Sequence, residues 1–121
     1  MKVLIIDDEH DMREIAALSL SRSGDIQVLT AGSGSEGLRM AREQQPDAIL
    51  LDLMMPAMDG RATLSALRRD EATAGIPVVV MSASSEDAAA LKPLGAVGVI
   101  PKPFDPLSLP ARLRAVLRNG H

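Results

Sequence analysis

The stretch AILLD at residues 48–52 is an unbroken apolar run that ends in a carboxylate, and it decides the fold. Two more runs are continuous in the same way, VLII at residues 3–6 and VVVM at residues 78–81. Continuous apolar runs are typical of strands that are covered on both faces, as in a parallel sheet. Shorter runs at residues 26–29 and 97–100 complete a set of five predicted strands.

The segments between these runs have helical spacing. Ser33 and Glu36 form a capping box at the start of one helix, and Gly24 supplies a left-handed stop to the helix before it. Asp105 predicts the cap of the last helix, in which Pro110 is expected to cause a kink. The five predicted helices cover residues 11–23, 33–44, 61–69, 85–91 and 105–119.

Strands that alternate with helices predict an α/β fold, because right-handed crossovers place the helices on both faces of a parallel sheet. With five such units we expect a flavodoxin-like, doubly wound five-stranded parallel sheet of order 2-1-3-4-5. A chain of 121 residues suits one domain, so residues 1–121 are interpreted as a single domain.

The composition excludes several classes of protein. The chain has no cysteine, which rules out disulfides and thiol chemistry, and its net charge of −3 argues against direct binding of nucleic acid. Its N-terminal residues predict no signal peptide, and it has no apolar stretch near the roughly 20 residues that a membrane span requires. We therefore expect a cytoplasmic protein that binds neither membranes nor nucleic acid directly.

Polar side chains follow four of the predicted strands. Asp7 and Asp8 end the first strand, Asp52 the third, Ser82 the fourth and Lys102 the fifth. The carboxyl ends of parallel strands meet at one edge of the sheet, and ligands bind there, next to the point where the strand order reverses. The topology therefore predicts that three carboxylates, a hydroxyl and an ammonium converge at one site.

Three carboxylates at one site repel one another strongly. Two unit charges about 4 Å apart repel by roughly 4 kcal/mol at an effective dielectric constant near 20. A hard divalent cation would offset this repulsion, and a few carboxylate ligands with retained waters suit Mg²⁺ better than Ca²⁺. With a cation and Lys102 nearby, the carboxylate of Asp52 is the best candidate for a nucleophile that attacks phosphorus.

In these residues the chain resembles bacterial two-component response-regulator receiver domains, and the resemblance covers residues 2–118. It rests on five motifs in the expected order. They are VLIIDDE at residues 3–9, ILLDLMMP at residues 49–56, MDG at residues 58–60, PVVVMSA at residues 77–83 and PKPF at residues 101–104.

The resemblance implies phosphorelay signalling. Asp52 would receive the phosphoryl group from a histidine kinase or a histidine phosphotransfer protein, and a downstream protein would respond to the resulting change of conformation. Asp8 would bind Mg²⁺ directly, Asp7 largely through water, and Met54 through its backbone carbonyl. Asp52 would be a further ligand.

The resemblance also implies roles for residues that follow the fourth and fifth strands. Ser82 would close onto the phosphoryl group, Lys102 would pair with it, and Pro103 would follow a cis peptide bond. The family usually has an aromatic residue three positions before the lysine, where this chain has Val99.

Two alternative functions remain open from the sequence. An aspartyl phosphatase needs an acid shortly after its nucleophile, and Met54 cannot serve as one. A receiver-like protein-interaction module that works without phosphorylation is the second alternative, and Val99 is its main support. We interpret the chain as a phosphoacceptor domain rather than an enzyme, with self-phosphorylation and self-dephosphorylation possible.

Overall fold

The structure is a computed structural model that describes residues 1–53, 60–83 and 90–119. Strands and helices alternate along the chain, as the pattern of apolar runs predicts. The strands are β1 (Lys2–Ile6), β2 (Gln27–Ala31), β3 (Ala48–Asp52), β4 (Val78–Ser82) and β5 (Ala96–Pro101). The helices are α1 (His10–Ser21), α2 (Gly34–Gln44), α3 (Gly60–Arg69), the short 3₁₀ helix η1 (Lys92–Leu94) and α5 (Leu109–Asn119).

All five strands are parallel and form one sheet in the order β2-β1-β3-β4-β5. This confirms the predicted flavodoxin-like fold class. The three central strands are buried at every residue except Lys2, which is partly buried, whereas β2 and β5 lie at the edges and contain exposed residues. Continuous apolar runs therefore marked the strands that are covered on both faces.

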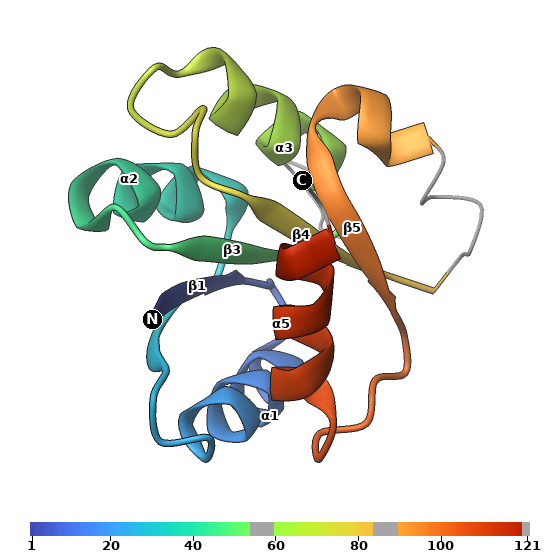
Figure 1. The fold of residues 1–121 in the computed structure, drawn as a ribbon. Helices are drawn as coiled ribbons and strands as arrows, with labels where there is room; N and C mark the ends of the chain where they lie inside the picture. The colour runs from blue at the N-terminus through green and yellow to red at the C-terminus, as the bar shows by residue number, and fades with distance from the viewer. Residues whose placement is uncertain (54–59, 84–89, 120–121) are drawn as a thin grey trace.

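The helices form two layers around the sheet. Helices α2 and α3 cover one face, and α1 and α5 lie side by side on the other (Figure 1). Successive residues of β1 point to opposite faces: Leu4 and Ile6 belong to one core cluster, and Val3 and Ile5 belong to the other. Each layer therefore has its own apolar core, and the sheet separates the two.

Two predicted helix boundaries depend on local hydrogen bonds and backbone angles. Ser33 caps α2 by accepting a hydrogen bond from the backbone N–H of Glu36, as the capping box predicts. Gly24 has φ +84°, the left-handed conformation that glycine adopts without strain, and it follows the end of α1.

The last helix begins later than the sequence predicts. Asp105 accepts a hydrogen bond from the backbone N–H of Leu107, so it closes a separate turn, and α5 begins only at Leu109. Pro110 is thus the second residue of the helix, where a backbone N–H has no partner within the helix anyway. The predicted kink inside the fifth helix is therefore wrong.

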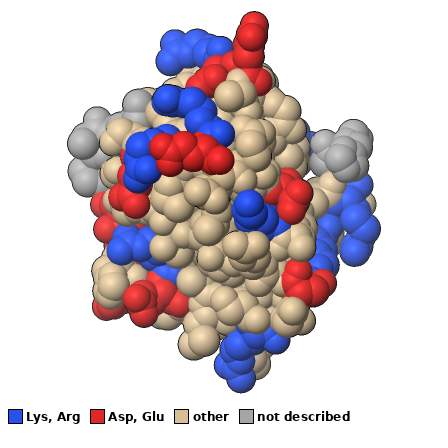
Figure 2. All heavy atoms as spheres, turned by 90° about the vertical axis from the view of Figure 1, so that its left-hand side faces the viewer, with Lys and Arg blue, Asp and Glu red and all other residues tan. Residues whose placement is uncertain are grey.

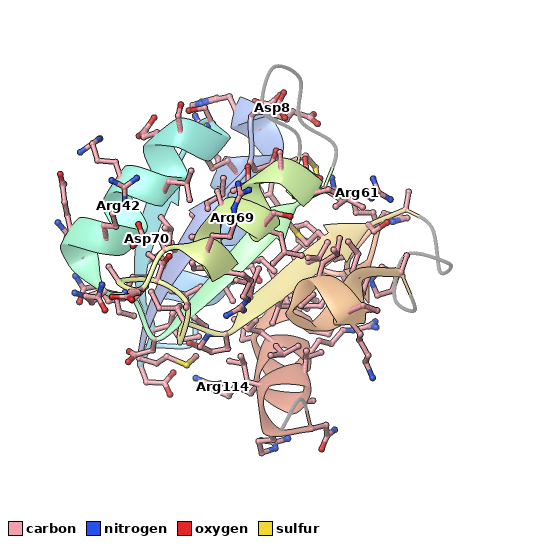
Figure 3. All side chains as sticks on the ribbon, turned by 90° about the horizontal axis from the view of Figure 1, so that it is seen from above. Asp8, Arg42, Arg61, Arg69, Asp70 and Arg114 are labelled. Carbon is pink, nitrogen blue, oxygen red and sulfur yellow. The ribbon has the colours of Figure 1, made fainter. Side chains whose placement is uncertain are left out.

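The predicted helix over residues 85–91 falls largely outside the described residues, which resume at Ala90 and lead into η1. On the face of the sheet that α2 and α3 cover, an ion pair joins α2 to the residue that follows α3. Arg42 of α2 and Asp70, which follows α3, lie 2.8 Å apart and are labelled in Figure 3.

Acidic and basic side chains are interspersed on the face that Figure 2 shows. Among the described residues, no helix is both long enough and apolar enough to cross a bilayer.

Gly60 brings the start of α3 into direct contact with the strand that carries the Asp52 carboxylate. A Cβ atom at this position would lie 2.7 Å from the carbonyl oxygen of Asp52 and closer still to Cα of Leu53. The backbone N–H of Gly60 donates to the carbonyl of Leu53 over 3.0 Å. Only a residue without a side chain allows this approach.

We expect Gly60→Ala to destabilise the protein, because the added methyl group must displace backbone rather than a flexible side chain. The free energy of unfolding, measured by urea denaturation, should fall by about 1–3 kcal/mol.

Gly75→Ala is the matched control, since a Cβ atom there would meet nothing within 4 Å. Its free energy of unfolding should stay within about 0.5 kcal/mol of the parent value. Equal effects of the two substitutions would contradict the close approach at Gly60.

Candidate functional site

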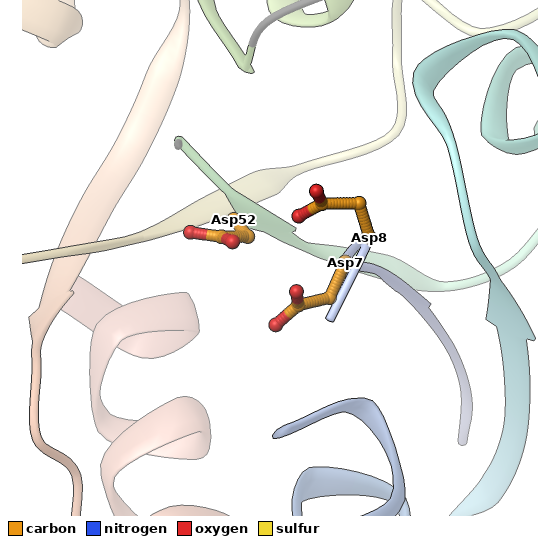
Figure 4. Close-up of side chains that lie close together, drawn as sticks. All are labelled: Asp7, Asp8 and Asp52. Atoms are coloured by element: carbon orange, nitrogen blue, oxygen red, sulfur yellow. The ribbon is translucent and has the colours of Figure 1, made fainter. Parts of the chain in front are cut away.

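Three aspartates lie together at the carboxyl ends of β1 and β3. Asp52 is the last residue of β3, and Asp7 and Asp8 directly follow β1. One carboxylate oxygen from each of the three lies within 4.8 Å of the others, and Figure 4 shows the side chains around a common space. The parallel pairing of β1 with β3 brings these residues together across 45 positions of sequence.

Asp7 is the most deeply buried of the three, with no exposed surface. Its Oδ1 accepts a hydrogen bond from the backbone N–H of Glu9 over 2.9 Å, while its Oδ2 has no hydrogen-bond partner. Burial raises the pKa of Asp7 to about 6, and the nearby charge of Asp52 adds to the increase. The Glu9 hydrogen bond and the Lys102 ammonium oppose it.

Lys102 pairs directly with Asp52. Its Nζ lies 2.7 Å from Oδ1 of Asp52, which is only 3% exposed. The backbone holds the lysine in place, because its N–H donates to the carbonyl of Ser82 over 2.8 Å. The peptide bond between Lys102 and Pro103 is cis. Four strands therefore contribute to the site, as the topology predicts.

Ser82 is the last residue of β4, and it is buried at the same edge of the sheet. It lies opposite Pro101 in the pairing of β4 with β5, so it is next to the residue that precedes Lys102. Val99, three residues before Lys102, is half-buried and packs against the core cluster beneath α2 and α3. Met54 lies outside the described residues.

The three carboxylates provide a set of ligands that suits a hard divalent cation. All the candidate ligand atoms are oxygens, and the Lys102 ammonium pairs with Asp52, one of the three carboxylates. The unpartnered Oδ2 of Asp7 is fully buried, and such an atom is costly to leave without a cation or a donor. These observations fit Mg²⁺, whose preferred protein ligands are carboxylate oxygens.

Arg13 of α1 supports the site, although no role for it was predicted from the sequence. Its guanidinium donates to the backbone carbonyl of Asp7 over 2.9 Å, while the backbone N–H of Asp7 donates to the carbonyl of Ala31. The main chain that carries Asp7 is thus held from both sides. An arginine in the first turns of a helix opposes the helix dipole. This unfavourable position is the feature of the sequence that could have indicated a role for Arg13.

The comparisons with known proteins agree with this geometry. Residues 3–114 match the family described as the response regulator receiver domain. The chain is 40% identical over 120 residues to the transcriptional regulatory protein AfsQ1 of Streptomyces coelicolor, covering 98% of this chain and 52% of that protein. It is 39% identical over 119 residues to the phosphate regulon transcriptional regulatory protein PhoB of Pseudomonas aeruginosa, covering 97% and 52%.

A solved structure shows the same arrangement of elements. The chemotaxis response regulator CheY4 of Vibrio cholerae is 32% identical and superposes with a TM-score of 0.87, covering 95% of this chain and 97% of that one. The chain spans about half the length of the curated relatives that it matches. The family match covers nearly the whole chain, and three aspartates lie together at the carboxyl ends of β1 and β3. The chain therefore belongs to the response regulator receiver domain family.

Proposed function

We propose that Asp52 of this receiver domain of two-component signalling accepts a phosphoryl group, and that residues 1–121 act as one phosphoacceptor domain. The observation that carries the proposal is the ion pair of 2.7 Å between Asp52 and Lys102, next to two further aspartates. The Asp52 carboxylate is held on a buried strand with a cation on one oxygen. The relatives give no support to the alternative of a phosphorylation-independent module.

The proposed step is an in-line transfer from a phosphohistidine. A carboxylate oxygen of Asp52 attacks phosphorus, the P–N bond breaks, and the imidazole leaves and takes up a proton from solvent. Lys102 keeps its ammonium beside the phosphoryl oxygens, where it offsets their negative charge. The hydroxyl of Ser82, buried at the end of the next strand, donates a hydrogen bond to a phosphoryl oxygen.

Asp7, Asp8 and Asp52 would hold Mg²⁺, together with the backbone carbonyl that we assign to Met54. When bound, the metal supplies positive charge that offsets the carboxylates and the incoming phosphoryl oxygens. The unpartnered Oδ2 of Asp7 supports this assignment, because no other described group satisfies it. Arg13 keeps the Asp7 backbone in position for the ligand.

The partners follow from the same chemistry. We propose that a histidine kinase or a histidine phosphotransfer protein supplies the phosphoryl group in the cytoplasm, and that a protein partner reads the phosphorylated state. The relatives named as transcriptional regulators are about twice as long as this chain. With a net charge of −3, these 121 residues are not expected to bind DNA by themselves.

We expect the protein to gain one phosphoryl group when it is incubated with acetyl phosphate and Mg²⁺, as intact-mass spectrometry would show. Asp52→Asn should abolish the adduct, because an amide is not a nucleophile at neutral pH.

Asp47→Asn serves as the matched control at a strand entry, on the opposite edge of the sheet. This variant should still be phosphorylated. An unmodified parent protein, or an adduct of equal yield in Asp52→Asn, would overturn the assignment of Asp52.

We expect the stability of the metal-free protein to fall as the pH rises through about 6. The pKa of Asp7 is about 6 in the folded chain and 3.8 without perturbation, so folding favours the protonated form. The contribution of protonated Asp7 to the free energy of unfolding is fully present below about pH 4 and is lost above pH 6. Asp7→Asn should therefore be about 1–3 kcal/mol more stable than the parent at pH 7.5 in EDTA.

The difference between Asp7→Asn and the parent should disappear near pH 4, and Mg²⁺ should stabilise the parent more than the variant. Urea denaturation at several pH values measures both effects. Glu71→Gln, on an exposed loop, is the control and should change neither. A variant less stable than the parent at pH 7.5 in EDTA would contradict the cost of the buried charge.

A further inference from the structure

Helix α1 presents an apolar stripe to solvent on the side away from the sheet. Leu18 is 62% exposed and Ile15 is 43% exposed, although both are large hydrophobic residues. Asp11 lies four residues before Ile15, and Arg22 lies four residues after Leu18. Ile15 and Leu18 are three residues apart, so these spacings place all four residues on one side of a helix. The stripe therefore has an acid at one end, two apolar residues in the middle and a base at the other end.

The surface on both sides of Leu18 is hollowed. One groove, with a volume of about 420 Å³, runs between α1 and the start of α5 and is lined by Ile15, Leu18, Pro106 and Pro110. A second, of about 350 Å³, lies on the other side and is lined by Leu18 and Thr30 together with the charged residues Arg13 and Glu14. Leu18 is a ridge between two grooves, the shape that helix packing by ridges and grooves requires.

The charged ends of the stripe are available for a contact outside the chain. Asp11 and Arg22 are both exposed. Neither forms an ion pair with any residue in the described ranges, in contrast to Asp25, which pairs with Arg114 nearby. Both side chains can therefore bind a partner without first breaking an ion pair within the chain.

We propose that this face of α1 binds a second copy of the chain, with the two α1 helices antiparallel across a twofold axis. In this arrangement Asp11 of each copy faces Arg22 of the other, and Ile15 faces Leu18. The stripe is complementary to itself in charge and in apolar character, which an isologous contact requires. Each Leu18 ridge would enter a groove of the other copy.

A helix of 12 residues is about 18 Å long, so the interface is at the small end of specific interfaces. We expect a reversible dimer with a dissociation constant of roughly 10–100 μM, which forms without phosphorylation or Mg²⁺. An experiment can therefore contradict the proposed dimer without contradicting the proposed phosphorylation of Asp52, and the reverse also holds.

Sedimentation velocity of the unphosphorylated chain over a range of concentrations tests the proposal, with an upper limit of about 1 mM. The parent should dimerise, and Leu18→Glu should remain monomeric, with circular dichroism showing that it is folded. Arg39→Asp, on α2 across the sheet, is the control and should dimerise as the parent does. A parent that stays monomeric would overturn the proposal and leave the face to a helix of another protein.

Charge reversal tests the pairing itself. Asp11→Arg and Arg22→Asp should each weaken self-association at least about tenfold, because each places like charges opposite one another. A mixture of these two variants should form a heterodimer, since every facing pair is then of opposite sign. The double variant should dimerise again. Failure of both the mixture and the double variant would overturn the antiparallel register even if the parent dimerises.

Discussion

Like charges buried at neighbouring strand ends are the constraint on which this structure depends. Asp7 and Asp52 are almost completely removed from water, Asp8 lies beside them, and the Lys102 ammonium pairs with Asp52. Each pair of unit charges about 4 Å apart costs roughly 4 kcal/mol at an effective dielectric constant near 20. The fold holds these groups together because the central strands end at the same edge of the sheet. The concentrated negative charge attracts cations and makes a carboxylate reactive.

The fold and the convergence of the site could be predicted from sequence because both follow from periodicity and topology. The apolar run at residues 48–51 shows that β3 is covered on both faces, and its position after a helix makes it parallel to β1. Once the strand order is known, residues directly after each strand must meet. Asp7, Asp52 and Lys102 could therefore be placed together without any knowledge of side-chain conformation.

Features that depend on tertiary contacts could not be predicted in the same way. The start of α5 depends on Asp105 closing its own turn, which left Pro110 in the first turn of the helix rather than in its interior. The contact of Arg13 with the Asp7 carbonyl depends on how α1 lies beside β1. The exposure of Leu18 likewise depends on which side of α1 packs against the sheet.

The layer formed by α1 and α5 joins the two ends of the chain. Val3 and Ile5 of β1 share a core cluster with Leu109 and Leu113 of α5, and the Ser19 hydroxyl donates to the carbonyl of Pro106. During synthesis the first strand leaves the ribosome long before the last helix exists. Half of the apolar core must therefore stay open until translation of these residues is almost complete, and a chain cut short before α5 would expose that surface to aggregation.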